Sequence, residues 1–556
     1  MVRLMRRFMA RPGLLIMALV ASLIIHLLSL ASSIYVIQVL NRYVSNGVDS
    51  TLITLTVGVL LAIVMEWILR RLRFRMMDGF TARPDAEIAG RGFFQLTGAR
   101  GSALIHLSEG QRREAMMAVA TLQGVLGREN LIALMDFPFA LLFVLALFIL
   151  NARIGVVASI MLGLVLVASL LLQWAVKQPM RQQNRLIVEH NQLLQSVLKA
   201  VEDIRIFNAH GMLRQVWGER QTRLNHARHR VALRQETLRQ ILATGSALMS
   251  VAVIAQGALL VVNGDMTSGA MIGANILAGR ALAIISRFSQ LGAAMEQGES
   301  AAASLEKLMK LPLEMPEGTA LQTFTGNLEL NDVAFVYPGS AVPLFESLSV
   351  RFIPGSLVVV AGDNGAGKTT LARLLTGFLD PVRGKILADG LEYRQMAAGW
   401  LRRQLVYFPQ EPVFFDGTLL DNIIVNRPDI PLERLNMMVD SAGLRRFVNE
   451  SPDGLQTRLE GGGGQLALGV RRRIALARGL VSDGMIAIFD DPLEGLDGQG
   501  VSAVMNILAA LKNNGRTVIV LSHDVTPFQE LADACLDLNM KPKPLLRRTL
   551  PGTKGA

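Results

Sequence analysis

The stretch VVVAGDNGAGKTTL, residues 358–371, decides what the C-terminal part of the chain can be. It starts as a short apolar strand, passes through a glycine-rich turn and ends as the first turn of a helix. Gly362, Gly367, Lys368 and Thr369 fit the template GxxxxGK[ST]. In that template glycines let backbone N–H groups curl around a phosphate, lysine reaches the outer phosphates, and the hydroxyl can ligate Mg²⁺. The stretch therefore predicts a nucleotide site with a position for Mg²⁺.

The whole turn is expected to surround the nucleotide phosphates, because its backbone N–H groups provide most of the contacts. The residues expected to contact the nucleotide here are Gly362, Asp363, Asn364, Gly365, Ala366, Gly367, Lys368, Thr369 and Thr370.

Composition indicates a membrane protein with more than one domain. The chain has 556 residues, of which 51% are hydrophobic and only 18% are charged, and its formal net charge is +11. That length exceeds what one compact core usually contains. Cys535 is the only cysteine, so an intrachain disulfide, a cysteine-type zinc site and a CxxC redox pair are all excluded.

Six apolar segments are long enough to cross a bilayer as helices. The first follows an arginine-rich start and is longer than the apolar core of a signal peptide, so we interpret it as a retained helix. The expected spans are residues 14–40, 51–69, 131–150, 154–174, 241–262 and 269–288.

Lysine and arginine are distributed unevenly between the loops. Residues 70–130 and 177–234 are rich in basic residues, mostly arginine, whereas the short loops hold only Arg42 and Arg153. Because basic residues favour the cytoplasmic side, both termini are expected there. The positive charge then lies beside the inner leaflet, which favours anionic lipid as a neighbour and argues against nucleic acid.

The pattern changes after residue 310, where Pro312, Pro316 and Gly318 interrupt the helix. Strands then alternate with helical segments, as in an α/β layer. We therefore expect an α-helical six-span membrane domain over residues 1–310 and an α/β P-loop domain over 325–540. The basic residues 541–556 are expected to form a disordered tail.

Further motifs follow the P-loop in a fixed order. The apolar strand MIAIFDD ends in Asp490 and Asp491, and a later strand ends in LSHD, residues 521–524. A carboxylate at the end of such a strand can hold Mg²⁺ in P-loop proteins. With these motifs the sequence resembles the ATP-binding cassette (ABC) transporters over essentially the whole chain. Six spans ahead of one cassette is the layout of an exporter half-transporter, which works as a homodimer or as a heterodimer with a second half-transporter.

The resemblance implies roles for single residues in this sequence. Tyr337 matches the aromatic residue that stacks on adenine, and Gln410 matches the glutamine that links Mg²⁺ and the attacking water to the membrane domain. Asp490 matches the aspartate that binds Mg²⁺ together with the P-loop threonine. Asp497 matches the D-loop aspartate, and His523 the switch histidine near the γ-phosphate.

The membrane half resembles a narrower group, the ATPases of type I protein secretion. The resemblance lies in the patterned stretches SIYVIQVLNRYVSNGVDSTLITLTVGVLL (33–61), LIALMDFPFALLFVLALFIL (131–150) and MTSGAMIGANILAGRALA (266–283). It implies a multi-pass protein of the bacterial inner membrane that exports unfolded polypeptides. It also implies a periplasmic adaptor and an outer-membrane channel as partners.

The sequence departs from the family at the signature LSGGQ, which contacts the partner's ATP. The basic helix RRRIALARGL (471–480) places the signature at residues 466–470, which read LALGV. Ala467 lacks the serine hydroxyl, Leu468 adds a side chain where the backbone must approach closely, and Gly469 remains. An insertion that brings Gly463-Gly464-Gln465 (463–465) into that place stays open as an alternative.

A second departure is Asp491, which stands where the family has its catalytic glutamate. Its carboxylate is one methylene short of the attacking water, a misplacement that can slow hydrolysis about 100-fold. Asp491 affects the site on this chain's own P-loop, whereas Ala467 and Leu468 affect the partner's site. We expect ATP to bind, hydrolysis to be slow, and Asp491→Glu alone to recover little.

Three functions are compatible with these residues. The first is a dimeric exporter of a polypeptide, the second exports a lipid or a small peptide, and the third is a non-hydrolysing ATP-binding partner subunit of a heteromeric exporter. The impaired signature favours the third, whereas Lys368, Gln410, Asp490 and His523 favour active transport.

Two groups of charged residues lie outside the cassette. Arg280 falls inside the sixth expected span, where a charge is costly, and Asp136 at similar depth is a candidate partner. A position of Arg280 outside the bilayer is an alternative. Glu202, Asp203 and Arg205 match the family region that docks onto the cassette, and a solvated helix face is their alternative interpretation.

Overall fold

A computed structural model describes residues 8–44, 47–314, 317–425, 427–540 and 544–547. The chain forms two compact units, of which the first comprises Met1–Thr97 and Leu107–Lys310. The second comprises Gly98–His106 and Leu311–Ala556. The boundary between the units falls after Lys310, and Gly98–His106 packs with the second unit, which the sequence did not indicate.

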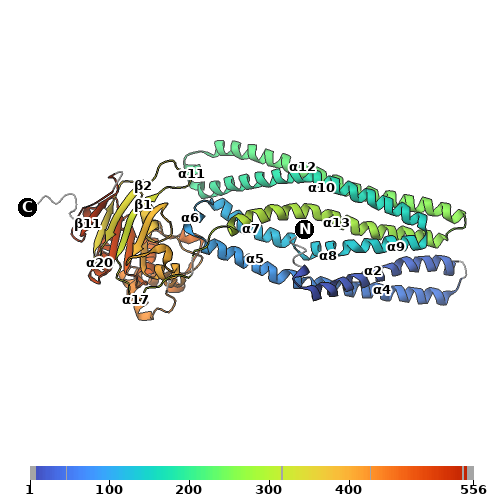
Figure 1. The fold of residues 1–556 in the computed structure, drawn as a ribbon, viewed down its shortest axis with the longest axis horizontal. Coiled ribbons are helices and arrows are strands. Elements are labelled where there is room, and N and C mark those ends of the chain that lie inside the picture. The colour runs from blue at the N-terminus through green and yellow to red at the C-terminus, as the bar shows by residue number, and fades with distance from the viewer. Residues whose placement is uncertain (1–7, 45–46, 315–316, 426, 541–543, 548–556) are drawn as a thin grey trace, which may run out of the picture. The chain divides into compact units, whose positions relative to one another are not determined.

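The first unit consists of long helices that run side by side (Figure 1). Six described helical segments are long and apolar enough to cross a bilayer, as expected. Several side chains on the second segment, such as Ile53 and Leu61, are exposed to their surroundings, as suits a lipid environment. The helices are α2 Pro12–Gln38, α4 Asp49–Met76, α5 Asp78–Gly98, α7 Glu109–Val125, α8 Arg128–Asp136, α9 Ala140–Leu150, α10 Ala152–Lys199, α11 Val201–Ile206, α12 His210–Val262 and α13 Ser268–Met309.

The third expected span is divided by a proline. Pro138 lies in a 3₁₀ turn, Phe137–Phe139, between α8 and α9. Proline lacks the backbone N–H that an α-helix uses, so the helix changes its hydrogen bonding there. The neighbouring helix α10 starts at a polar cap, since Asn151 Oδ1 accepts a bond from Arg153 N at 2.9 Å.

The second unit contains a six-stranded sheet in the order β12-β11-β3-β10-β9-β6 and a four-stranded sheet in the order β2-β1-β4-β5. In the larger sheet β11, β3, β10, β9 and β6 are parallel, and each is almost entirely apolar. The strands are β1 Leu328–Phe335, β2 Phe345–Phe352, β3 Leu357–Ala361, β4 Arg383–Ala388, β5 Leu391–Glu392, β6 Leu405–Phe408, β7 Gly417–Thr418, β8 Arg458–Leu459, β9 Ile486–Asp490, β10 Thr517–Ser522, β11 Ala534–Asp537 and β12 Leu545–Arg547.

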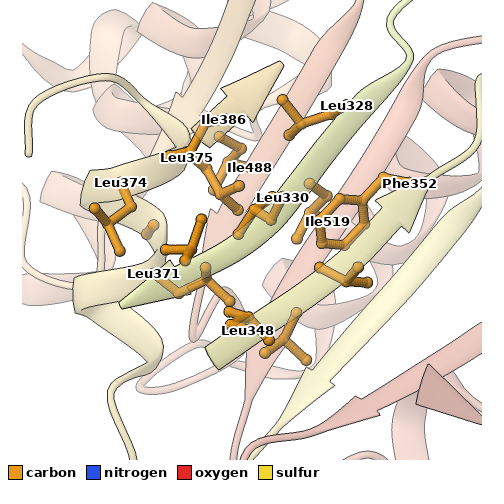
Figure 2. Close-up of a cluster of buried hydrophobic side chains, with 14 of the residues drawn as sticks. Leu328, Leu330, Leu348, Phe352, Leu371, Leu374, Leu375, Ile386, Ile488 and Ile519 are labelled. Atoms are coloured by element: carbon orange, nitrogen blue, oxygen red, sulfur yellow. The ribbon is translucent and has the colours of Figure 1, made fainter. Parts of the chain in front are cut away.

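A hydrophobic core joins the two sheets to the helix that follows the P-loop. Figure 2 shows Leu330 and Phe352 from the smaller sheet directed toward Leu371 of the helix and toward Ile488 and Ile519 of the larger sheet. All five are fully or almost fully buried. This packing fixes the helix against the end of β3, where the nucleotide site is expected. The helices are α14 Lys368–Leu375, α15 Ala398–Arg403, α16 Leu419–Ile424, α17 Leu432–Ser441, α18 Arg445–Glu450, α19 Leu468–Leu480 and α20 Gly498–Asn513.

The short helix α6, Gly101–Leu104, explains why Gly98–His106 belongs to the second unit. A Cβ on Gly101 would lie 2.1 Å from the carbonyl oxygen of Phe378, so only glycine permits this close approach. Ser102 Oγ donates to Asp380 Oδ2 at 2.6 Å. A segment from the loop between two spans is thus held directly on the cassette.

The end of the chain differs from the expectation of a disordered tail at one point. Leu545–Arg547 forms β12, which pairs antiparallel with β11 at the edge of the sheet. Residues 541–543 and 548–556 lie outside the described part of the chain.

Candidate nucleotide site

The expected site residues meet at one edge of the larger sheet. Four neighbouring parallel strands, β3, β10, β9 and β6, end there. The P-loop follows β3, His523 follows β10, Asp490 ends β9, and Gln410 lies just after β6. Ligands of open α/β sheets bind at this carboxyl edge, so the topology itself brings the four motifs together.

The P-loop has the geometry of a phosphate-binding turn. Gly367 has a φ of 105°, and a Cβ there would lie 2.8 Å from the ring of Phe345. Lys368 begins α14, and its Nζ donates to the carbonyl oxygens of Gly362 at 2.7 Å and Asp363 at 3.3 Å. The lysine therefore bends back over the loop and places its charge where the outer phosphates are expected.

Tyr337 lies beside the P-loop helix. Its hydroxyl is 2.9 Å from Thr370 Oγ1, and its ring packs edge-on against Phe335 with centroids 5.0 Å apart. The structure therefore brings this expected adenine-binding residue close to the P-loop, while stacking on the base stays a prediction.

Asp490 is suited to hold a cation. It is fully buried at the end of β9, and neither of its carboxylate oxygens has a hydrogen-bond partner among the described residues. Burial, together with the neighbouring Asp491 carboxylate, raises the pKa of Asp490 to about 6, although the Thr369 hydroxyl and the Lys368 ammonium oppose this rise. Two unpartnered carboxylate oxygens in a buried position are an oxygen donor set of the kind that Mg²⁺ uses.

Asp491, His523 and Gln410 form one connected group. Asp491 Oδ1 lies 3.3 Å from both the backbone N and the Nδ1 of His523, and Oδ2 accepts from Gln410 Nε2 at 3.4 Å. Asp491 is almost fully buried and has a φ of 44°, a left-handed conformation that aspartate tolerates better than most residues. The carboxylate is thus directed toward two of the expected catalytic side chains.

Glu494 and Arg472 also belong to this group, although the sequence did not indicate them. Glu494 Oε2 accepts from Gln410 Nε2 at 3.3 Å, so the Gln410 amide lies between the carboxylates of Asp491 and Glu494. Hydrogen bonding from Gln410, together with the charge of Arg472, lowers the pKa of Glu494 and keeps it ionised.

Arg472, on α19, hydrogen-bonds to three residues of this site, Gln410, Asp491 and Glu494. Its guanidinium donates to the backbone oxygens of Gln410 and Asp491 at 3.2 Å, to the backbone oxygen of Glu494, and to Glu494 Oε2 at 3.1 Å. Only 2% of its side chain is exposed. The closeness of Glu494 to Asp491 in sequence could have indicated the first residue, but no local pattern indicates Arg472.

The signature segment, residues 466–470, lies at the start of α19. Ala467 is the N-cap residue and makes no side-chain capping bond, whereas a serine hydroxyl there could accept one. Leu468 is 39% exposed, and a Cβ on Gly469 would meet no atom within 4 Å. The alternative residues Gly463-Gly464-Gln465 (463–465) precede this helix start, and Gly463 ends a 3₁₀ turn.

The expected D-loop residue Asp497 caps α20. Its Oδ1 accepts from Gly500 N at 2.8 Å, and Arg473 Nη2 donates to the same oxygen at 2.9 Å. The bond from Gly500 and the Arg473 charge lower the pKa of Asp497. Because Arg473 lies on α19, the expected D-loop residue is connected to the helix that follows the expected signature.

The proposed pairing of Arg280 with Asp136 in the membrane half is wrong. Asp136 instead pairs with Arg73, whose Nη1 lies 2.5 Å from Asp136 Oδ1 and donates to Ser22 Oγ at 2.7 Å. His26 Nε2 is also 3.2 Å from Asp136. Arg280 Nη2 donates to Ser32 Oγ at 3.2 Å. Arg73 pairs with Asp136 because α4 places it at the same depth in the bundle. The positions of the two residues along the chain do not indicate this pairing.

The charged residues expected to dock onto the cassette lie on α11. Glu202, Asp203 and Arg205 are all exposed there, so docking by this helix stays a prediction.

Comparisons with known proteins agree with this geometry. Residues 345–494 match the family model described as ABC transporter. The chain is 24% identical over 513 residues to the exotoxin translocation ATP-binding protein PaxB of Pasteurella aerogenes, covering 92% of this chain and 72% of that protein. It is 25% identical over 511 residues to the alpha-hemolysin translocation ATP-binding protein HlyB of Escherichia coli O157:H7, with the same coverage of 92% and 72%. In fold it is similar to a bacterial Atm1-family ABC exporter with ATP bound, with a TM-score of 0.85 at 20% identity over 97% of this chain and 96% of that one.

Proposed function

Because the chain is an ABC exporter homologous to type I secretion translocation ATPases, we propose that it couples ATP binding and slow hydrolysis to polypeptide export. The names of its relatives, which describe translocation of an exotoxin and of alpha-hemolysin, support a polypeptide as the cargo. The six apolar helices support a place in the bacterial inner membrane. The distribution of basic residues supports cytoplasmic termini. A periplasmic adaptor and an outer-membrane channel are part of the same proposal.

The observation that carries the proposal is the convergence of Lys368, Asp490, Gln410 and His523 at one sheet edge. Lys368 and the P-loop N–H groups bind the phosphates of ATP. Thr369, Asp490 and Gln410 would hold Mg²⁺, which when bound offsets the negative charge on the phosphates. The unpartnered oxygens of Asp490 fit that role.

Hydrolysis requires a carboxylate that takes a proton from the attacking water. Asp491 is in position to do so between His523 and Gln410, but its side chain is one methylene shorter than glutamate. A shortfall of about 1 Å can slow such a step roughly 100-fold. ATP binding, which depends on the P-loop, is retained.

The complete site requires a second half-transporter, either a second copy or a related chain. In the closed dimer the segment around Ala467, Leu468 and Gly469 and the D-loop residue Asp497 face the partner's ATP. Ala467 and Leu468 weaken that contact, because a hydroxyl is lost and a side chain is added.

The test is to purify the full-length protein from its native membrane and to measure ATP binding and hydrolysis in the same sample. We expect labelled ATP to bind with Mg²⁺, Lys368→Ala to abolish binding, and hydrolysis to be slow. Hydrolysis as fast as that of an intact exporter, abolished by Asp491→Asn, would contradict the proposal of an impaired site.

A second candidate function is that of a non-hydrolysing ATP-binding partner in a heteromeric exporter. The uncapped Ala467 and the exposed Leu468 at the start of α19 favour it. Identification of the chains that co-purify separates the two functions. An intact half-transporter in the sample supports the second, and a self-associated chain with measurable hydrolysis supports the first.

A further inference from the structure

A recess lined by arginines lies inside the first unit. Two cavities adjoin there, because Arg70, Ala133 and Arg287 line both of them. The larger cavity has a volume of about 530 Å³ and also contacts Arg73, and the smaller one reaches Arg280. We call the two together the arginine recess.

Two of these arginines have their charge already balanced. Arg70 pairs with Glu66 at 2.6 Å, and Arg73 pairs with the buried Asp136 at 2.5 Å. The Arg73 pair is buried and the Arg70 pair is partly exposed along α4, and in both the arginine charge is balanced by a carboxylate.

Arg280 and Arg287 are different. Neither forms an ion pair with any carboxylate in the described part of the chain, and the one hydrogen bond of Arg280 goes to Ser32. They lie seven residues apart on α13, which is two helical turns, so they face the same side. Exposed Glu129 is the remaining acid among the described lining residues. Among the described residues, the recess therefore contains two guanidinium groups without an ion-pair partner, those of Arg280 and Arg287, and one unpaired carboxylate, that of Glu129.

The depth of the recess indicates which anion can reach it. Its lining comes from the end of the second span, the start of the third and the middle of α13, and the smaller cavity continues deeper to His26 of α2 and Phe143 of α9. The span ends near Arg287 carry the basic loops and are expected at the cytoplasmic face, at the level of lipid headgroups, while Arg280 lies two helical turns deeper. Phe74, Ile132 and Leu291 form apolar walls beside the arginines.

We propose that the arginine recess binds the phosphate of an anionic phospholipid from the cytoplasmic leaflet. The planar guanidinium groups of Arg280 and Arg287 form paired hydrogen bonds with phosphate oxygens. The apolar walls accept the first methylene groups of the acyl chains. A bound phosphate also removes the cost of holding two unpaired charges at the membrane boundary.

The test uses the purified full chain after detergent delipidation. Dioleoylphosphatidylglycerol is added back, and the bound lipid is measured by native mass spectrometry. The variant R280Q/R287Q is compared with R71Q/R75Q, which removes the same charge from exposed positions of α4 that do not line the recess. An arginine near the membrane surface contributes about fivefold in affinity, so we expect R280Q/R287Q to bind roughly 25-fold more weakly. We expect R71Q/R75Q to bind within about twofold of the parent.

Three outcomes would overturn the proposal. An equal loss of lipid affinity in both double variants would mean that the lipid is attracted by the general positive charge of the surface and not by the arginine recess. Equal retention of dioleoylphosphatidylcholine would mean that the anionic headgroup is not recognised. Displacement of the lipid by inorganic phosphate alone would mean a site for free phosphate. Thermal unfolding without lipid checks the fold of R280Q/R287Q. If the double variant does not fold, R287Q alone, which changes an exposed residue, should still lose about fivefold in lipid affinity.

Discussion

The guanidinium of Arg472 connects three segments that lie far apart in the sequence. It donates to Gln410, Asp491 and Glu494, and it is almost completely buried. A buried charge needs partners, and removing one of them leaves the others strained or unsatisfied. The position of the Gln410 amide in the site therefore depends on Glu494 as well as on Asp491.

The first prediction concerns Glu494→Gln. This change removes the carboxylate that accepts from Gln410 and pairs with Arg472, so Gln410 is held less firmly beside Asp491. A hydrogen bond to a charged group contributes about 1.5–3 kcal/mol, and half-exposed Glu494 belongs at the lower end. We expect kcat for ATP to fall about tenfold and the affinity for ATP to stay within about twofold, measured by ATPase and binding assays.

The matched control is Glu450→Gln. Glu450 pairs with Arg446 one turn away on α18, and both side chains are largely exposed. Surface pairs of this kind contribute little, so both assays should remain unchanged. Equal ATPase rates for Glu494→Gln and the parent would show that Gln410 does not need the second carboxylate.

At this scale the local motifs were predictable and the contacts between them were not. The P-loop, Asp490 and His523 follow from strand ends, because each motif depends on a few neighbouring residues. Arg472 and Glu494 act through Gln410 and Asp491, which follow β6 and β9, and their roles appear only once the chain is folded. The Asp136 pairing failed for the same reason, since Arg73 comes from another helix.

At the scale of single elements, the contact of α6 with the cassette leads to the second prediction. In Gly101→Ala the new methyl group would overlap the backbone of Phe378, which cannot move as a flexible side chain could. We expect α6 to move away from Phe378 and the Ser102–Asp380 bond to be lost. The free energy of unfolding of the second unit should fall by about 1–3 kcal/mol, as is typical of overpacking, and its melting temperature should fall with it. Differential scanning calorimetry measures it.

Gly90→Ala is the control for that substitution. Gly90 lies inside α5, and a Cβ there would meet no atom within 4 Å. Alanine is a better helix former than glycine, so stability should be unchanged or slightly higher. If Gly101→Ala were as stable as Gly90→Ala, the close approach of α6 to Phe378 would not exist in solution.

The strand β12 leads to the third prediction. It pairs with β11, where Cys535 lies opposite Arg547 and is only 2% exposed. Burial raises the pKa of the Cys535 thiol, so less of it is thiolate at pH 8 than for a free cysteine. Truncation after Met540 removes β12, and we expect iodoacetamide to label Cys535 faster in the truncated chain. Mass spectrometry of the labelled protein gives the rate.

Labelling in denaturant is the reference for that experiment, since Cys535 is the only cysteine and every label reports on it. Equal rates for the folded full-length and truncated chains would mean that β12 does not cover the thiol. The pH dependence has a definite sign: because the pKa is raised in the folded state, native labelling should increase at a higher pH than labelling of the unfolded chain.

Elements were predictable where their own residues determine them. The six long apolar helices and the strands before the P-loop, Asp490 and His523 are recognisable from hydropathy alone. The helix α6 has four residues and the strand β12 three, and each is stabilised by contacts with another element, Asp380 for α6 and β11 for β12. No period in the sequence reveals such elements, because the stabilising contacts are tertiary.

At the scale of the whole molecule, the two departures from the family act on different sites of the proposed dimer. In the proposed dimer, Asp491 acts in the site on its own P-loop, whereas Ala467 and Leu468 are expected to face the partner's nucleotide. A homodimer then has two sites with both defects. A heterodimer with an intact chain has one defect in each site. The composition of the dimer therefore determines how slow hydrolysis is.

This division leads to the fourth prediction, for the protein that purifies as a homodimer. Asp491→Glu alone should recover little, because each site still lacks the signature contact and the αL backbone at this position suits aspartate better than glutamate. Ala467→Ser with Leu468→Gly should likewise recover little, because the short carboxylate remains. Groups that act together in one site are not additive, so only all three substitutions should raise kcat, by at least about tenfold. Recovery by Asp491→Glu alone would show that the signature is functional as it stands, and that residues 466–470 are not where the partner's ATP is contacted.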